Sequence, residues 1–192
     1  MANSISKLRD LTSAPATAEH QEDFNKAVSD DADDRGVCLI LTAQLENELD
    51  RAIDHWIDNG DKKLRDELYG GDGPLGTLSR KCAFAAAIGL IGPITRENLR
   101  AIRNIRNAFA HAKRPITFDT DEVAAVCGEL KTINIYDPPR EMAPIDDLTP
   151  RKQFETVAAQ TMIRLTSYTG FDVQLKDDDG KPELTLKSEP LP

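Results

Sequence analysis

One short stretch of this chain combines side chains that can do acid–base and phosphate chemistry. It runs from Ile105 to His111 and contains Arg106 and Asn107. Residues four apart on a helix are neighbours, so Asn107 and His111 are expected to share a face. These types suit metal-free RNA cleavage, with His111 as proton donor or acceptor, Arg106 stabilising charge on the phosphate and Asn107 orienting one of them.

The same residues have an equally concrete structural interpretation. A histidine in the last turn of a helix is favoured by the helix dipole and can bind free backbone carbonyls. An arginine beside it can clamp an acidic neighbour, such as the cluster Asp30–Asp34. From the residues alone, the clamp is favoured over catalysis. The two hypotheses predict opposite environments: buried and hydrogen-bonded side chains for a clamp, accessible ones for a catalytic site.

The helix that carries this stretch is the most basic part of an acidic protein. The 192 residues have a net charge of -9, while residues 96–114 carry +5, so the remainder carries -14. An acidic chain is a poor general binder of nucleic acid, because attraction to phosphates supplies most non-specific affinity. We therefore expect a protein partner or a homodimer, with at most a weak nucleic-acid contact through residues 96–114. The expected basic binding face consists of Arg96, Arg100, Arg103, Lys113 and Arg114.

The composition and periodicity predict an all-α fold around these residues. Aromatic residues make up only 5% of the chain, so the core must be mostly aliphatic. Apolar side chains at helical spacing predict a single bundle of about six helices in residues 17–170. Residues 1–16 are expected to form a flexible N-terminal arm. Residues 171–192 are expected to form a small β-hairpin or a tail.

The basic helix is expected to end near His111 and to turn Phe109 toward the core. Thr95 is a good candidate for its N-cap. The next helix is expected to begin after Asp119 or Thr120 and to run to about Ile135.

The sequence contains a motif that resembles a cofactor-binding site, but the residues around it do not support cofactor binding. The run Gly71–Gly76 fits a dinucleotide-binding pattern, but a helix precedes it and Pro74 removes an amide, so it predicts a turn. No His-x-x-His or Cys-x-x-Cys spacing occurs, and neither a metal nor a cofactor is expected. Cys38, Cys82 and Cys127 are expected to be reduced core residues of a cytoplasmic protein. No apolar run is long enough to predict a membrane span.

Arg106 and His111, with four residues between them, resemble the R-x4-H motif of the HEPN superfamily. Many members of that all-helical superfamily are metal-independent ribonucleases that work as dimers. The resemblance implies catalytic roles for Arg106 and His111, with Asn107 in support.

A longer series of motifs resembles the mannitol operon repressor family over roughly residues 30–135. Its parts are Asp34-Arg35-Gly36, Leu45–Leu49, Leu68-Tyr69-Gly70, Pro74–Lys81, Ala86–Ile91 and Leu99–His111. The resemblance implies a cytoplasmic, all-helical transcriptional regulator linked to the use of sugar alcohols. No helix-turn-helix with a basic second helix free to enter a groove is evident, so this regulator is expected to act through protein contacts. The alternatives are a HEPN-like ribonuclease and a structural adaptor, and a non-enzymatic role is favoured.

Overall fold

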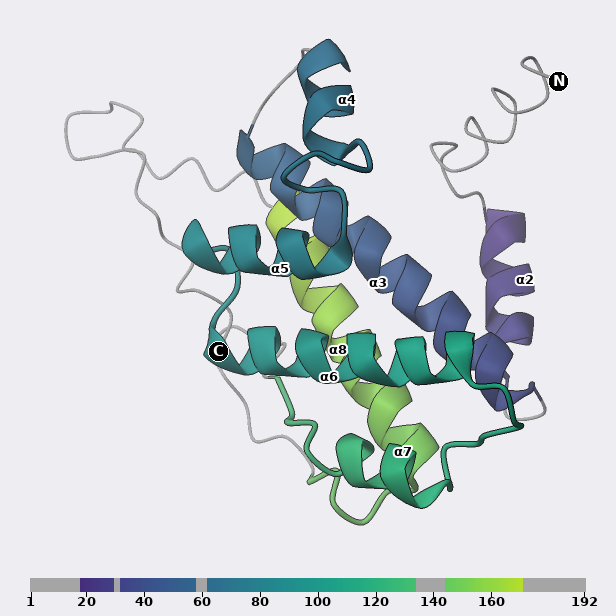
Figure 1. Cartoon of the computed structure of the whole chain (residues 1–192). Helices are drawn as coiled ribbons and strands as arrows, with labels where there is room; N and C mark the ends of the chain where they lie inside the picture. Colours follow the sequence, from purple (N-terminus) through teal and green to yellow (C-terminus); the bar gives the residue numbers. More distant parts are fainter. Residues whose placement is uncertain (1–17, 30–31, 58–61, 134–143, 171–192) are drawn as a thin grey trace, which may run out of the picture.

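The computed structural model describes residues 18–29, 32–57, 62–133 and 144–170. These ranges form seven α-helices, which confirms the all-α prediction (Figure 1). The helices are α2 (Ala18–Ala27), α3 (Asp34–Ile57), α4 (Lys62–Tyr69), α5 (Leu78–Ala87), α6 (Pro93–His111), α7 (Asp121–Cys127) and α8 (Pro150–Gly170). The expected arm at residues 1–16 and the expected hairpin or tail at residues 171–192 lie outside the described residues.

The long helices α3 and α8 lie side by side and make the most extensive helix–helix contact in the described part of the chain. They run in the same direction. Asp34 at the start of α3 bonds Arg151 at the start of α8, and Glu48 further along bonds Thr166. Helices α5 and α6 lie across this pair, and α7 packs against α6 and α8 (Figure 1).

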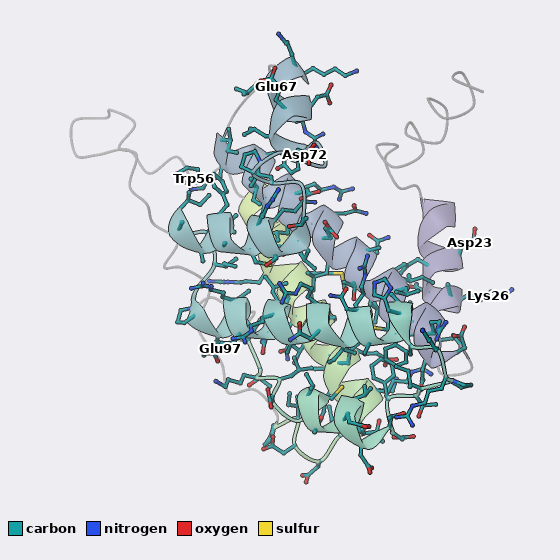
Figure 2. The ribbon with its side chains drawn as sticks, in the orientation of Figure 1. Asp23, Lys26, Trp56, Glu67, Asp72 and Glu97 are labelled. Atoms are coloured by element: carbon teal, nitrogen blue, oxygen red, sulfur yellow. The ribbon has the colours of Figure 1, made fainter. Side chains whose placement is uncertain are left out.

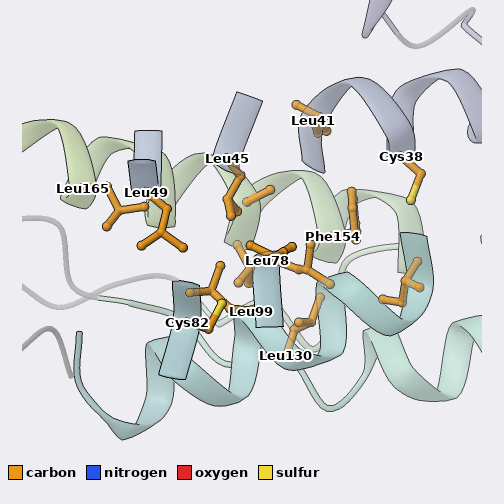
Figure 3. Packing of buried hydrophobic residues seen from close by; sticks show 14 of the residues in the cluster. Cys38, Leu41, Leu45, Leu49, Leu78, Cys82, Leu99, Leu130, Phe154 and Leu165 are labelled. Carbon is orange, nitrogen blue, oxygen red and sulfur yellow. The ribbon is translucent and has the colours of Figure 1, made fainter. Parts of the chain in front are cut away.

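One apolar core joins α3, α5, α6 and α8, whose side chains point into a shared interior (Figure 3). Three phenylalanines extend it beyond the end of α6. The ring centroids of Phe109 and Phe118 lie 5.0 Å apart, and those of Phe118 and Phe154 lie 5.1 Å apart. Such tilted pairs contribute about 0.5–1.5 kcal/mol each beyond simple burial. Phe109 is completely buried, as predicted, and this determines which face of α6 points to solvent.

The start of α6 differs from the prediction. Gly92 is the N-cap and Pro93 is the first helical residue, whereas Thr95 is completely buried within the first turn. Proline suits this position because its fixed φ matches a helix and its missing N–H would have no helical partner. The expectation that Thr95 caps the helix was therefore wrong.

Helix α7 ends at Cys127, well before the predicted end near Ile135, because buried amides on other helices bind the backbone that follows it. The Asn98 side chain on α6 accepts a hydrogen bond from Lys131 N at 2.9 Å and donates one to Lys131 O at 2.7 Å. On α8, Gln160 accepts a hydrogen bond from Ile133 N at 3.0 Å. These bonds replace the helical ones that the backbone would otherwise make.

The glycine-rich segment between α4 and α5 is a turn, as predicted. A Cβ on Gly73 would lie 2.3 Å from Glu67 O, and one on Gly76 would lie 2.4 Å from Gly70 O. Glycine is therefore needed here because the chain folds tightly back over the end of α4, which brings α5 against α3.

Lys81 holds α5 onto α3 by one ammonium shared between two carboxylates. Its Nζ lies 2.7 Å from Glu46 Oε1 and 2.8 Å from Asp50 Oδ2, and its side chain is only 9% exposed. Burial raises the pKa of Asp50 to about 6, against the opposing pull of Lys81. Asp50 Oδ1 is buried with no hydrogen-bond partner, so this carboxyl group is incompletely satisfied when ionised.

Arg151 of α8 joins the start of α3 to the end of α2. Its guanidinium donates to Ser29 O at 2.7 Å, to Ala32 O at 2.8 Å, to Asp34 Oδ1 at 3.1 Å and to Glu155 Oε1 at 2.8 Å. The planar guanidinium, with five donors in a fixed fork, is the side chain best suited to this number of acceptors.

The three cysteines are free and buried, as expected for reduced core residues. Burial raises the pKa of each thiol to about 12, so none is poised as a nucleophile. Among the described helices, none is both long and apolar enough to cross a bilayer.

Candidate functional site

The basic face predicted from the sequence lies on the solvent side of α6 and on the loop that follows. Arg96, Arg100, Lys113 and Arg114 are exposed, and Arg103 is half-buried. The opposite side of the helix is buried through residues that include Leu99, Ile102, Ile105 and Phe109. The amphipathic pattern of α6 therefore presents its arginines outward, because burying its apolar stripe leaves them no other direction.

The structure divides this basic face into two parts. Arg96, Arg100 and Arg103 are spaced four and three residues apart, so they form one stripe along the first half of α6. Lys113 and Arg114 follow the end of the helix, and Arg114 lies 3.8 Å from Glu122 in an exposed ion pair. The first part lines a groove.

That groove lies between α5 and α6 and has a volume of about 550 Å³. Its α6 side carries the three arginines together with Glu97 and Leu99. Its α5 side offers Ser79, Cys82 and Ala83, of which Ser79 and Ala83 are exposed. Arg103 comes near enough to Cys82 to counteract, in part, the burial that raises the pKa of this thiol. The arrangement is a cationic hollow with a partly apolar lining.

A second groove, of about 660 Å³, lies on the other side of α6, toward α7. Its charges are mixed, since Glu97, Glu129 and Asp146 line it together with Arg100 and Lys131. Glu97 lies near the exposed start of α6 (Figure 2) and accepts a 2.7 Å hydrogen bond from Lys131 Nζ, which lowers its pKa. This groove has no marked preference for an anion.

The candidate catalytic residues lie at the far end of α6. Arg106 and His111 are exposed and Asn107 is half-buried. Arg106 and His111 are five residues apart, which places them about 140° apart around the helix. A 3.1 Å hydrogen bond from Arg106 Nη1 to Asn107 Oδ1 draws the guanidinium toward the face that Asn107 shares with His111. The structural hypothesis required buried partners, and neither Arg106 nor His111 is buried.

The expected clamp exists, but Arg151 makes it in place of Arg106. Asp34, the last acid of the cluster, binds Arg151 and also accepts a hydrogen bond from Phe118 N at 2.9 Å. Arg35 reaches the end of α6 near His111 and donates to Ala112 O at 3.4 Å. The sequence signal for Asp34 was its place before a long helix, but nothing local indicates a partner on α8.

Helices α5 and α6 form an antiparallel hairpin across α3 and α8 (Figure 1). A DNA-binding helix-turn-helix instead sets its helices at about 90–120° so that the second can enter the major groove. Among the described residues, no group of three or more histidine, cysteine or acidic side chains is placed to hold a metal ion.

Comparison with known proteins finds similarity to mannitol operon repressors. No family model matches the chain. Over 79 residues it is 30% identical to the mannitol operon repressor of Escherichia coli (strain K12), which is 41% of this chain and 40% of that protein. The figures are the same for the mannitol operon repressor of Escherichia coli O6:H1. The chain thus matches less than half the length of these curated relatives.

A solved structure extends the likeness to the fold. A chain in the X-ray structure of the MtlR-HPr complex from Escherichia coli superposes with a TM-score of 0.51 at 20% sequence identity, covering 78% of this chain and 95% of that chain. The resemblance to the mannitol operon repressor is therefore confirmed, over part of the sequence and in the architecture.

Proposed function

We propose that this protein, similar in sequence and fold to the mannitol operon repressor, is a regulator of that type that acts by binding another protein. The observation that carries the proposal is the fold shared with a chain solved in complex with HPr, over 95% of that chain. A protein of the HPr kind is accordingly the first partner to test.

The charge distribution supports protein contacts over DNA reading. The basic stripe of α6 is short, and the rest of the chain is strongly acidic, so a long polyanion would meet repulsion beyond the stripe. The antiparallel packing of α5 and α6 also presents no recognition helix of the helix-turn-helix kind. An acidic patch on a folded partner would complement the charge of the exposed arginines and lysine of residues 96–114.

The test is direct binding to purified HPr from the same organism, measured by calorimetry and size-exclusion chromatography. We expect a saturable complex. Charge reversal at Arg96 and Lys113 is expected to weaken it at least about tenfold, since close charge pairs at interfaces are worth about 1.5 kcal/mol or more. Lys63→Glu on α4, also exposed, is the matched control and should leave binding unchanged. A protein that binds operator DNA tightly and HPr not at all would contradict the proposal.

A metal-independent ribonuclease of the HEPN kind is the second candidate, favoured by the exposure of both Arg106 and His111. We expect His111→Ala to change the free energy of unfolding by less than about 0.5 kcal/mol, as is usual for exposed positions. Cleavage of labelled RNA in a chelator, lost in this stable variant, would establish catalysis. If neither protein cleaves single-stranded or structured RNA, the ribonuclease hypothesis fails. A destabilised His111→Ala would restore the structural interpretation.

A further inference from the structure

We propose that the groove between α5 and α6 is a binding site for a small molecule that carries a phosphate monoester. Arg96, Arg100 and Arg103 would hold the phosphate, and Ser79 and Ala83 would face the rest of the ligand. This site does not depend on a protein partner and goes beyond the proposed function.

The charges of the three arginines are offset only in part, by Glu97, which lines the same groove and interacts electrostatically with Arg100. None of them forms an ion pair within the described part of the chain, although exposed lysines and arginines on α3, α4 and α8 do. The carboxylate of Glu97 in the groove lining forms its ion pair with Lys131, at 2.7 Å. Three unpaired guanidinium groups along one groove repel one another, and a dianion between them relieves that repulsion. Arginine is also the side chain whose fork matches phosphate oxygens in pairs.

Arg103 adds a donor that lacks an acceptor. Its Nε is buried and has no hydrogen-bond partner, while its Nη2 donates only to Asn104 Oδ1, at 3.2 Å, on the same helix. An unsatisfied buried donor destabilises a protein and usually marks a missing partner. The side chain is half-buried and held by this one contact, so a small rotation would present Nε and Nη together to a bound phosphate.

The size and lining of the groove favour a small molecule over a nucleic acid. A volume of about 550 Å³ lies within the range of roughly 300–1,000 Å³ that is usual for small-ligand sites. The hollow exists because the α5 residues opposite the arginines, Ser79, Cys82 and Ala83, have small side chains. The cationic stripe is confined to this groove, and the chain outside residues 96–114 carries a net charge of -14, which disfavours a long polyanion.

The experiment is calorimetric titration at constant ionic strength with glucose 6-phosphate, inorganic phosphate, glucose and a short single-stranded RNA. We expect saturable binding of the phosphate ester, weaker binding of inorganic phosphate and none of glucose. Arg100→Gln should weaken binding of the ester at least about tenfold, because a charge-assisted hydrogen bond is worth about 1.5–3 kcal/mol. Arg100→Lys keeps the charge but loses the fork, so it should cause a smaller loss.

Two further variants separate a site from general attraction. Ala83→Leu leaves the charge unchanged and fills the groove, so it should abolish binding of the ester. Lys113→Gln removes one charge from the same basic segment outside the groove and should change affinity less than about twofold. The proposal would be overturned if Lys113→Gln and Arg100→Gln weakened binding of the ester equally, or if Ala83→Leu bound it normally. It would also be overturned if the protein preferred RNA or if binding of the ester did not saturate. Thermal melts confirm that each variant is folded. HPr is absent from these titrations, so a negative result contradicts the phosphate site without bearing on the proposed binding of HPr.

Discussion

Lys81→Met is expected to lower the free energy of unfolding by about 2–3 kcal/mol near pH 7. Removing one partner of a buried ion pair typically costs about 3–5 kcal/mol, because a desolvated charge is left uncompensated. Here the loss is smaller, since the side chains of Asp50 and Glu46 keep 21% and 29% of their exposure and water reaches them. Chemical denaturation of both proteins measures the difference. Lys63→Met removes the same charge from a side chain that is 87% exposed and should cost less than about 0.5 kcal/mol.

The effect of Lys81→Met should depend on pH in a defined direction. The pKa of Asp50 is raised from 3.8 to about 6 in the folded protein, so the folded state binds more protons between these values. The contribution of Asp50 to stability is therefore most favourable below pH 4 and is lost as the pH rises through 6. Without Lys81 this pKa rises further. The gap between variant and wild type should thus widen as the pH rises through about 6, where Asp50 ionises in the wild type but not in the variant. A gap independent of pH would contradict the assignment.

A double variant tests the same cause independently. Asp50→Asn removes the buried charge that Lys81 compensates, so Lys81→Met combined with Asp50→Asn should recover part of the stability lost in Lys81→Met. Purely additive losses would mean that the stem of Lys81 stabilises α5 by packing alone.

Arg151→Met is expected to cost a similar amount, about 2–3 kcal/mol. The change leaves two backbone carbonyls, Ser29 O and Ala32 O, and the carboxylate of Asp34 without their shared donor. Its side chain is 16% exposed, so water replaces these bonds only in part. Amide hydrogen exchange should also accelerate selectively in α2 and at the start of α3, where the lost bonds end.

The adjacent Lys152 provides a matched control. It bonds the same Glu155 at 2.8 Å but its side chain is 46% exposed. Lys152→Met should therefore cost less than about 0.5 kcal/mol. Arg151→Lys should be intermediate, because an ammonium cannot reach carbonyls and carboxylates on both sides as the guanidinium does. If Arg151→Met and Lys152→Met lowered the free energy of unfolding equally, the hydrogen bonds of the Arg151 guanidinium would not contribute to stability as we expect.

Local patterns predicted the features of the fold that depend on local physics. Helical spacing of apolar residues identified the buried face of α6, including Phe109, because this spacing is a property of one segment. The end of α7 was not predictable in this way, since Asn98 and Gln160 lie about 30 residues away and bind backbone whose own side chains look helical. The prediction for Thr95 was wrong because a hydroxyl side chain caps a helix only from the position just before its first helical residue. Pro93 starts α6 two residues earlier, so Thr95 lies inside the helix.

For the candidate site, too, the sequence predicted local features but not contacts between distant segments. Residue type and spacing identified the arginines and predicted that they share the outer face of α6. The groove also requires Ser79 and Ala83 on a different helix, and small residues carry no signal of what they face. The structural interpretation paired the acidic cluster before α3 with the arginine near His111. The partner in the structure is Arg151, which the parallel packing of α3 and α8 brings to Asp34.

That parallel pairing has a consequence for how the protein is made. The partners at the start of the two helices, Asp34 and Arg151, are 117 residues apart in the chain. During synthesis α3 emerges early, yet its apolar stripe from Val37 to Ile53 finds its main cover only when α8, the last described helix, has been translated. Until α8 has been made, the apolar stripe of α3 can be covered only in part, by α5 and α6. Chaperone engagement and aggregation should concentrate on truncated forms that end before residue 150.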